Sequence, residues 1–369
     1  MKRKTRGRIF SLVVLILVGL VVFNRHRIAQ FISPQEHSGD LELEEIIEYP
    51  ITRDATSVMD DVYVGNDATA FFEDGQFRVH SPEGELVWSK EFHGPILVDK
   101  SRDRYLIAEK QTGNTYVFDL KGEFIGSALA QGALSRVELL EDNRVLLGGR
   151  GNRRIMLLDE TMETTADIRV LQGSIINYNV SLDGNNIVCL VLDDTEGELR
   201  SSVFIYNAQG ELIKMRPLTA FATDATIFGN ELFVVYQDRI MKYDQSLEQL
   251  DFELELNQVS SSERIGDSLL ITTGHIDPTR GFGELELIEF SLNNSSIKSR
   301  QKIKENYDNI EMTDDYYATY TRNMLRIYDK SGVEQYYQTY DTPLRKVSLL
   351  DDERIALIFP NRLIIYQIQ

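Results

Sequence analysis

The sequence predicts an all-β fold, and three observations support this prediction. A short phrase recurs along the chain, as in "YVFDLKGEFIG" (residues 116–126) and "FIYNAQGELIK" (residues 204–214). Each copy follows a polar turn and a further apolar strand, as in "IFGNELFVVY". Long amphipathic helical periods are missing after residue 41. Each repeated unit therefore offers four short strands separated by turn residues.

The repeat gives the number of units. Aligning the phrase on the residue that follows its apolar stretch places it at Ser81, Asp119, Asp159, Asn207, Asp244, Ser291 and Asp329, with its beginning again at Gln367. The spacings are 38, 40, 48, 37, 47, 38 and 38 residues. Eight units of about forty residues, each with four strands, are typical of an eight-bladed β-propeller. The recurring Asp and Gly suit the turn that joins the third strand to the fourth.

The two ends of the repeat region complement each other. The last unit stops at Gln369 after three strands, and "LELEEIIEYPI" (residues 41–51) is a strand candidate without a unit of its own. We expect this N-terminal strand to be the fourth strand of the last blade, which closes the ring and covers an otherwise open edge.

The residues before the propeller predict a membrane anchor and a tether. Residues 1–8 are basic, and residues 9–23 ("IFSLVVLILVGLVVF") form an uncharged run that flanking arginines can extend to the membrane interface. No small-residue cleavage site follows, so we expect an uncleaved signal anchor, a single transmembrane helix, rather than a cleaved signal peptide. More basic residues precede the run than follow it, which predicts a cytoplasmic N-terminus. Residues 24–40 are then a tether, and residues 41–369 a propeller outside the cell membrane.

Charge and cysteine usage exclude several functions. After residue 30 the chain has 32 Lys and Arg against 58 Asp and Glu, and such an acidic body repels nucleic acid. Cys189 is the only cysteine, so the chain has no internal disulfide and lacks the usual cysteine-based zinc motifs. Its apolar setting, "NIVCLVL", predicts a buried strand residue.

The phrase "SPEGELVW" (residues 81–88) resembles the blade motif of quinoprotein-like propellers, the PQQ-type and BamB-like eight-bladed proteins. Trp88 is the only tryptophan, so regular tryptophan docking between blades is lost elsewhere. The complete layout is similar to a family of membrane-anchored propellers of unknown function from Gram-positive bacteria. That resemblance implies fold and location and supplies no catalytic residues.

Motifs for catalysis or cofactor binding are not found. Quinone-dependent enzymes of this fold use an adjacent cysteine pair, which a single cysteine excludes. "GGRGNRR" (residues 148–154) lacks the ending of a phosphate-binding loop, and "DDTEGE" (residues 193–198) lacks the ligand spacing of a calcium loop. The histidines have no zinc-like spacing. We therefore expect no catalytic residues, cofactor or metal, and a protein that is not an enzyme.

Recognition is expected on the loops. The two long spacings predict longer connections between second and third strands, around residues 193–201 and 274–284, on one face. Acids occupy the turns between first and second strands on the opposite face: Asp67, Asp103, Asp142, Asp183, Glu231, Asp267, Asp314 and Asp352. We expect an acidic protein partner on the face with the longer connections, at Arg150, Arg153, Arg154, His275, Arg280 and Phe282, although a tolerated surface insertion remains open there.

These observations together predict a non-catalytic, membrane-anchored scaffold that binds a protein partner in envelope assembly or maintenance. An extracytoplasmic sensor or small-ligand binder is the alternative. A deep axial pocket with converging charged groups favours the alternative, whereas a broad loop face favours the scaffold.

Overall fold

The structure is a computed structural model, and it describes residues 41–51, 61–140, 142–149, 153–181, 184–195, 198–276, 283–303, 307 and 309–369. For a few of these, at the tips of two long hairpins and at Ile303, the backbone alone is described. Every regular element in this part of the chain is a β-strand. The predicted transmembrane helix and tether lie outside the described residues. Within the described ranges, no helix has the length and apolar character needed to cross a membrane.

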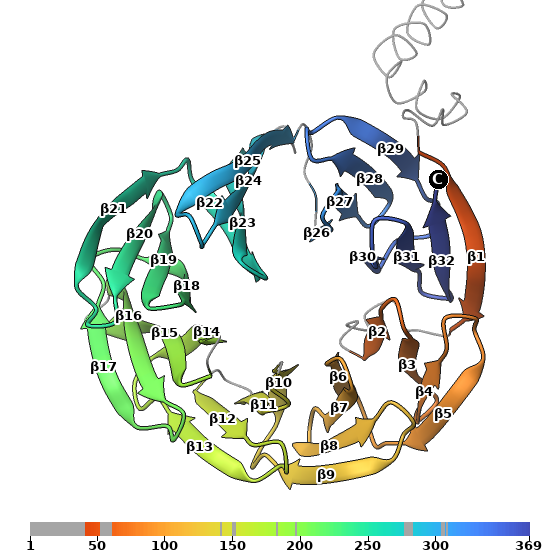
Figure 1. Cartoon of the computed structure of the whole chain (residues 1–369), viewed down its shortest axis with the longest axis horizontal. Helices are drawn as coiled ribbons and strands as arrows, with labels where there is room; N and C mark the ends of the chain where they lie inside the picture. Colours follow the sequence, from red (N-terminus) through yellow and green to blue (C-terminus); the bar gives the residue numbers. More distant parts are fainter. Residues whose placement is uncertain are drawn as a thin grey trace, which may run out of the picture.

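The strands form eight four-stranded antiparallel sheets arranged as blades around a central opening (Figure 1). Blade 1 contains β2 (Val62–Val64), β3 (Thr69–Glu73), β4 (Gln76–His80) and β5 (Leu86–Glu91). Blade 2 contains β6 (Ile96–Lys100), β7 (Arg104–Glu109), β8 (Asn114–Asp119) and β9 (Phe124–Leu129). Blade 3 contains β10 (Leu134–Leu139), β11 (Val145–Gly149), β12 (Arg154–Leu158) and β13 (Thr164–Arg169). Blade 4 contains β14 (Ser174–Val180), β15 (Asn186–Thr195), β16 (Glu198–Asn207) and β17 (Leu212–Pro217).

The second half of the ring repeats this order. Blade 5 contains β18 (Ala222–Phe228), β19 (Glu231–Tyr236), β20 (Arg239–Asp244) and β21 (Gln249–Glu255). Blade 6 contains β22 (Val259–Ile265), β23 (Ser268–Ile276), β24 (Gly283–Ser291) and β25 (Ser296–Ile303). Blade 7 contains β26 (Asn309–Met312), β27 (Tyr316–Thr321), β28 (Met324–Asp329) and β29 (Glu334–Thr339). Blade 8 contains β30 (Lys346–Leu349), β31 (Arg354–Ile358), β32 (Arg362–Ile368) and, as its outer strand, β1 (Leu43–Pro50).

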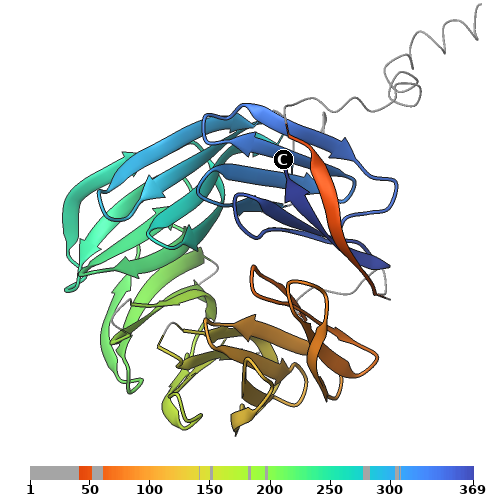
Figure 2. The ribbon, with the colours of Figure 1, turned by 45° about the vertical axis from the view of Figure 1, so that its right-hand side comes forward.

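The N-terminal strand closes the ring as predicted. β1 pairs antiparallel with β32, from Leu43 opposite Ile368 to Pro50 opposite Arg362 (Figure 2). Backbone hydrogen bonds join Glu42 and Gln369 in both directions. Tyr49 and Ile51 are buried in a cluster that joins blade 8 to blade 1. The predicted fold and its closure are therefore confirmed.

Antiparallel strands give the ring two faces. The turn face carries the turns that join first to second strands and third to fourth strands. The connection face carries the links between second and third strands and between blades. Ile368 N–H donates to the carbonyl of Glu353, which lies in the turn between β30 and β31, so β1 begins on the turn face.

The hydrophobic core lies between blades. Each pair of neighbouring blades shares one buried cluster, so the core is a circle of separate interfaces rather than one centre. Trp88 of blade 1 docks on blade 2, where its indole Nε1 donates to the carbonyl of Leu120 at 3.1 Å. At the interface of blades 6 and 7, the Gln301 amide donates in the same way to the carbonyl of Lys330 at 2.9 Å. Other side chains thus replace the docking tryptophan, in agreement with its predicted loss.

The repeated phrase is a side-chain-capped turn. Asp119 Oδ1 accepts from the backbone N–H groups of Lys121 and Glu123, at 2.9 and 2.7 Å. Asp159, Asn207 and Asp329 make the same pair of bonds in their blades. The phrase recurs because a short oxygen acceptor at this position holds the turn between third and fourth strands.

In their described parts, the two units with long spacings have longer second and third strands. In blade 4, Asp193 pairs with Arg200 and Thr195 with Glu198, so most of the expected loop at 193–201 is a hairpin. In blade 6 the ladder continues to Ile276 opposite Gly283. The extra residues therefore lie where the spacings predict them, between second and third strands, and their described part is paired strand.

Candidate functional site

The described part of the predicted partner surface holds Arg153 and Arg154. Arg153 is exposed, and its carbonyl accepts from Val170 N–H. Arg154 is mostly buried and makes two bonds to the Asp167 carboxylate, at 2.7 and 3.1 Å, and one to the carbonyl of Gln131. Its guanidinium ties β12 to β13 and to the link between blades 2 and 3, so it is committed to the fold.

The remaining predicted residues are described in part or not at all. His275 lies near the end of β23, and its side chain is not described. Arg150, Arg280 and Phe282 lie outside the described residues. Blades 3 and 6, which carry the two halves of the set, are separated by blades 4 and 5 (Figure 1). The partner surface therefore stays a prediction, and its described positions lie on two blades that are not neighbours.

The acids of the turn face are largely paired. Asp67 pairs with Lys100 of the next blade at 2.6 Å, and Asp142 pairs with Arg144 at 2.7 Å. The other pairs are Asp103 with Arg104, Glu231 with Lys242, and Asp267 with Lys298. Asp314 and Asp352 are the described members for which the structure shows no ion pair; Asp352 accepts the N–H of Asp315 at 3.0 Å. Unpaired acid therefore gathers on blades 7 and 8.

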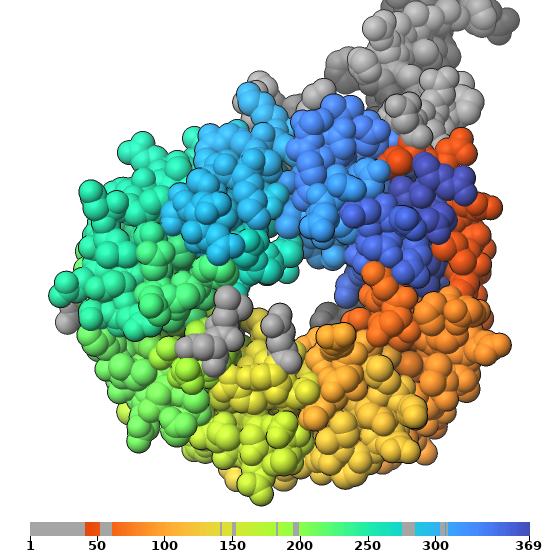
Figure 3. Space-filling view, in the orientation of Figure 1, coloured from red at the N-terminus to blue at the C-terminus, as the bar shows by residue number. Residues whose placement is uncertain are grey.

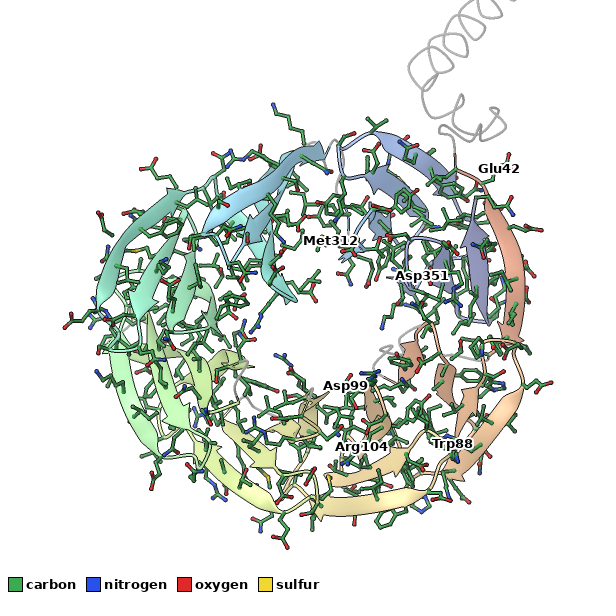
Figure 4. The ribbon with its side chains drawn as sticks, viewed as in Figure 1. Glu42, Trp88, Asp99, Arg104, Met312 and Asp351 are labelled. Atoms are coloured by element: carbon green, nitrogen blue, oxygen red, sulfur yellow. The ribbon has the colours of Figure 1, made fainter. Side chains whose placement is uncertain are left out.

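A first hollow, of about 740 Å³, opens on the turn face across blades 6 to 8. Its charged lining consists of Asp267, Glu289, Lys298, Asp314, Lys330, Asp351 and Asp352. Figure 4 shows Met312 and Asp351 on the side of the central opening, whereas Trp88 lies further out within the ring. These charges come from turns and strands far apart in the sequence, and the ring brings them to one place.

Glu289 organises the first hollow. Its side chain is 12% exposed and accepts from the hydroxyl of Tyr317 at 2.9 Å. Lys298 lies 3.5 Å and Lys330 3.8 Å from its carboxylate. Lys330 Nζ also stands 4.0 Å from the centre of the Tyr317 ring. Burial lowers the pKa of Lys330, although the charges of Glu289, Asp314 and Asp352 act in the opposite direction.

A second hollow, of about 730 Å³, lies against the first on blades 3 to 6. Both hollows are lined by Gly266 and Asp267. Arg136, Arg144 and Arg264 give the second hollow its basic groups. Arg136 lies over the Tyr178 ring at 4.6 Å, and Arg144 donates to the carbonyl of Gly184 at 2.7 Å. The turn face therefore carries both acids and bases where it surrounds the central opening, a region called the channel mouth below. This corrects the expectation of a face dominated by acids.

Carboxylates on the inner strands hold neighbouring blades together below this mouth. Asp99 in β6 accepts from the backbone N–H of Leu139 in blade 3 at 2.6 Å. Asp224 in β18 accepts from Asn177 in blade 4 and from the Ser262 hydroxyl in blade 6. Burial raises the pKa of Asp99 and of Asp224 to about 6, and that of Glu311 in β26 to about 7. The opening that these strands surround is visible in the space-filling view (Figure 3).

Two further predictions concern reactive groups. Cys189 lies in β15 and is fully buried, as predicted, and burial raises the pKa of its thiol to about 12. A thiol in this setting is unreactive. Among the described residues, no group of three or more His, Cys, Asp and Glu side chains gathers as metal ligands.

The family model of the DUF5711 family, described as a family of unknown function, matches residues 48–368. This chain belongs to the DUF5711 family. A search of curated proteins gives no match.

Among solved structures, the chain is similar to three proteins. The first is BamB from Moraxella catarrhalis, with a TM-score of 0.57 and 11% identity, covering 88% of this chain and 100% of that one. The second is the C-terminal WD40 domain of Sif2, with a TM-score of 0.60 and 10% identity, covering 89% and 98%. The third is Sqt1 from Saccharomyces cerevisiae, with a TM-score of 0.62 and 8% identity, covering 89% and 100%. These likenesses confirm the BamB-like propeller fold.

The two hollows could not be read from the sequence. The turn acids Asp267, Asp314 and Asp352 were recognised, but each looks like an ordinary solvated turn residue. Lys298 and Lys330 sit in an outer strand and in a turn, and nothing in their spacing indicates that they converge on Glu289. Their meeting depends on the order of blades around the ring.

Proposed function

We propose that the chain is a non-catalytic binding scaffold, anchored in the cell membrane by residues 9–23, whose propeller engages a protein partner outside the membrane. The observation that carries this proposal is the surface around the channel mouth, where two hollows adjoin: the first is lined mainly by acids, and the second by arginines and acids together. Pockets for small molecules are mostly apolar, whereas this lining is charged and broad. Such a surface suits the polar contacts of a protein partner.

The described turn acids without an ion pair indicate which part of the turn face binds the partner. Asp314 and Asp352 on blades 7 and 8 are the turn acids without an ion pair in the described residues, so a partner with basic side chains fits that side. The sequence-based alternative places an acidic partner on the connection face at Arg150, Arg153 and Arg280. The two proposals place the partner on opposite faces, so they can be tested separately.

Affinity capture of the full chain from its own membranes distinguishes the two faces. We expect Asp314→Lys with Asp352→Lys to reduce capture of the partner about tenfold or more, because like charges then meet across the interface. The matched variant, Arg150→Glu with Arg153→Glu and Arg280→Glu, should leave capture unchanged. The opposite result would move the partner to the connection face, and full capture by both variants would contradict a charged interface.

Membrane anchoring has its own test. Cys189 is buried, so a cysteine placed at Ser38 in the tether is the one accessible thiol expected in the chain. An impermeant thiol reagent should label Ser38→Cys in intact cells. Labelling that requires lysis would reverse the proposed orientation.

The hollows also favour a second candidate, a sensor of a small cationic ligand. The first hollow is within the volume range of ligand pockets, and its unpaired carboxylates would attract an amine. A thermal shift of the full chain with a polyamine, lost in Asp314→Asn with Asp352→Asn, would support this candidate over the scaffold.

A further inference from the structure

The outer strand of blade 2 differs from the other outer strands of the propeller. Each outer strand is the last in its sheet and so presents an edge. Proteins commonly protect such edges with charged residues or proline. The outer strands β1, β5, β13, β17, β21, β25 and β29 each contain a charged residue. β9, "FIGSAL", contains neither a charge nor a proline.

β9 also exposes large apolar side chains. Phe124 is 59% exposed and Leu129 is 60% exposed, and Ile125 lies between them on the same strand, also exposed. The neighbouring outer strand β5 adds Leu86 and Val87, both exposed. β9 has one register shift against β8, at Ile125, and is paired in register from Gly126 to Leu129. Apolar side chains on an uncharged edge are the features of a strand that pairs with another chain.

The backbone of β9 has free positions for such a pairing. Ala130 N–H donates inward to the carbonyl of Gly113. Because the direction of backbone groups alternates along a strand, the N–H and C=O groups of Ser127 and Leu129 point away from β8. These groups lie at the edge of the sheet and can form a new ladder.

The sequence of β9 is complementary to itself in the antiparallel direction. A two-fold axis at Ser127 places Ile125 of one copy opposite Leu129 of the other, and Glu123 opposite Gln131. Apolar side chains then meet, and the acid faces an amide. Self-pairing of β21, with Asp251, Glu253 and Glu255, or of β25, with Lys298, Arg300 and Lys302, would instead bring like charges together.

The direction of β9 sets the geometry of the pair. Figure 1 shows β9 running along the circumference of the ring. Antiparallel neighbours are related by a two-fold axis perpendicular to their sheet, and at the rim this axis lies along the propeller axis. Two copies paired through β9 therefore keep the same face up, with both β1 strands beginning on one side. This arrangement lets both copies attach to a single surface.

We propose that β9 is a dimerisation edge, at which the β9 strands of two copies of this chain pair antiparallel around Ser127. The two blades then form one continuous sheet across the dimer. The inference is independent of the partner proposed for the channel mouth.

Cysteine crosslinking in membranes that contain the full chain tests the pairing. Ser127→Cys places two thiols opposite each other on the same side of the joined sheet, within reach of a short bifunctional thiol reagent. Ser89→Cys is the matched control, because Ser89 is exposed at the equivalent position of β5. We expect about tenfold more crosslinked dimer for Ser127→Cys, since pairing raises the local thiol concentration.

A second variant separates pairing from chance collision. Leu129 is largely exposed, so Leu129→Lys should leave the melting temperature unchanged while placing a charge on the edge. In the Ser127→Cys background it should reduce crosslinking to the Ser89→Cys level. Equal crosslinking of Ser127→Cys and Ser89→Cys, crosslinking that survives Leu129→Lys, or a product containing a different protein would each overturn the proposal.

Discussion

The turn face and the connection face use their charged residues differently. On the turn face, Lys100 reaches Asp67 of the previous blade and Lys298 reaches Glu289 within blade 6, so cations support a hollow surface. On the connection face, Arg154 bonds Asp167 and Arg239 bonds Glu253, so cations hold third strands to fourth strands. A count of charged residues on each face, made from the sequence, therefore overstates the electrostatic potential of both faces, because many of these charges are paired. Among the described turn acids, Asp314 and Asp352 are the two for which the structure shows no ion pair.

The largest effect on this two-faced arrangement is expected from β1, which runs from one face to the other. Deleting residues 1–51 removes Tyr49 and Ile51 from the interface of blades 8 and 1 and exposes β32 as an edge. Each buried side chain contributes about 1.5–3 kcal/mol, so we expect a loss of several kcal/mol and of cooperativity in thermal unfolding. Deletion of residues 1–40 is the control and should leave the transition unchanged. A transition that is also unchanged without β1 would contradict closure.

Substitutions at two glycines of blade 2 compare how tightly the two faces are packed. Gly113 on the connection face and Gly122 on the turn face both have φ of 79°. A methyl group at Gly113 would collide with the carbonyl oxygens of Ala130 and Gly132, and one at Gly122 would lie 2.7 Å from the Trp88 ring. We expect Gly113→Ala to cost about 3 kcal/mol and Gly122→Ala slightly less, because a side chain yields more easily than backbone. Chemical denaturation measures both.

Gly94 provides the control for these glycines. It has φ of 75° and no atom within 4 Å of the added methyl group, so Gly94→Ala isolates the backbone cost of about 1 kcal/mol. If all three variants lose the same stability, neither turn is packed as tightly as described.

Asp224 lies on the inner strand β18, between the two faces, and makes the stability of the propeller depend on pH. Its pKa is raised from 3.8 to about 6 in the folded state, so its contribution to stability is present below pH 4 and is lost as the pH rises through 6. Asp224→Asn removes this titration. The free energy of unfolding of the variant, relative to that of the wild type, should rise by on the order of 2 kcal/mol from pH 4 to pH 7.5. Thermal unfolding of both proteins at the two pH values measures the gain, and a difference independent of pH would exclude the raised pKa.

The smallest effect is expected at a single capped turn of the turn face. Asp119→Ala removes the acceptor of two backbone N–H groups, which should cost about 1 kcal/mol. Asp119→Asn keeps an acceptor oxygen and should recover most of that stability. Equal losses in the two variants, measured by denaturant unfolding, would mean that the cap does not hold the turn.

The sequence predicts the fold more fully than the site because the two depend on different information. Asp119, Asp159 and Asp329 recur at a regular interval, and each contributes within its own turn, so local chemistry repeats visibly. The orphan strand at residues 41–51 follows from counting strands. Arg154 looked like a surface cation, but its partner Asp167 lies across a hairpin and takes up its charge. The contacts of Glu289 depend on the curvature that brings blades 6 and 7 together.

Closure by β1 also has a consequence for how the ring is made. Glu44 and its hydrogen-bond partner Gln369 lie 325 residues apart in the chain. During synthesis β1 emerges first, yet its partner β32 emerges after every other strand of the ring. The loop that joins them is long, and contacts of such separation form slowly. Blade 8 is therefore expected to assemble last. Until then β1 is unpaired, and other nascent chains can pair with it.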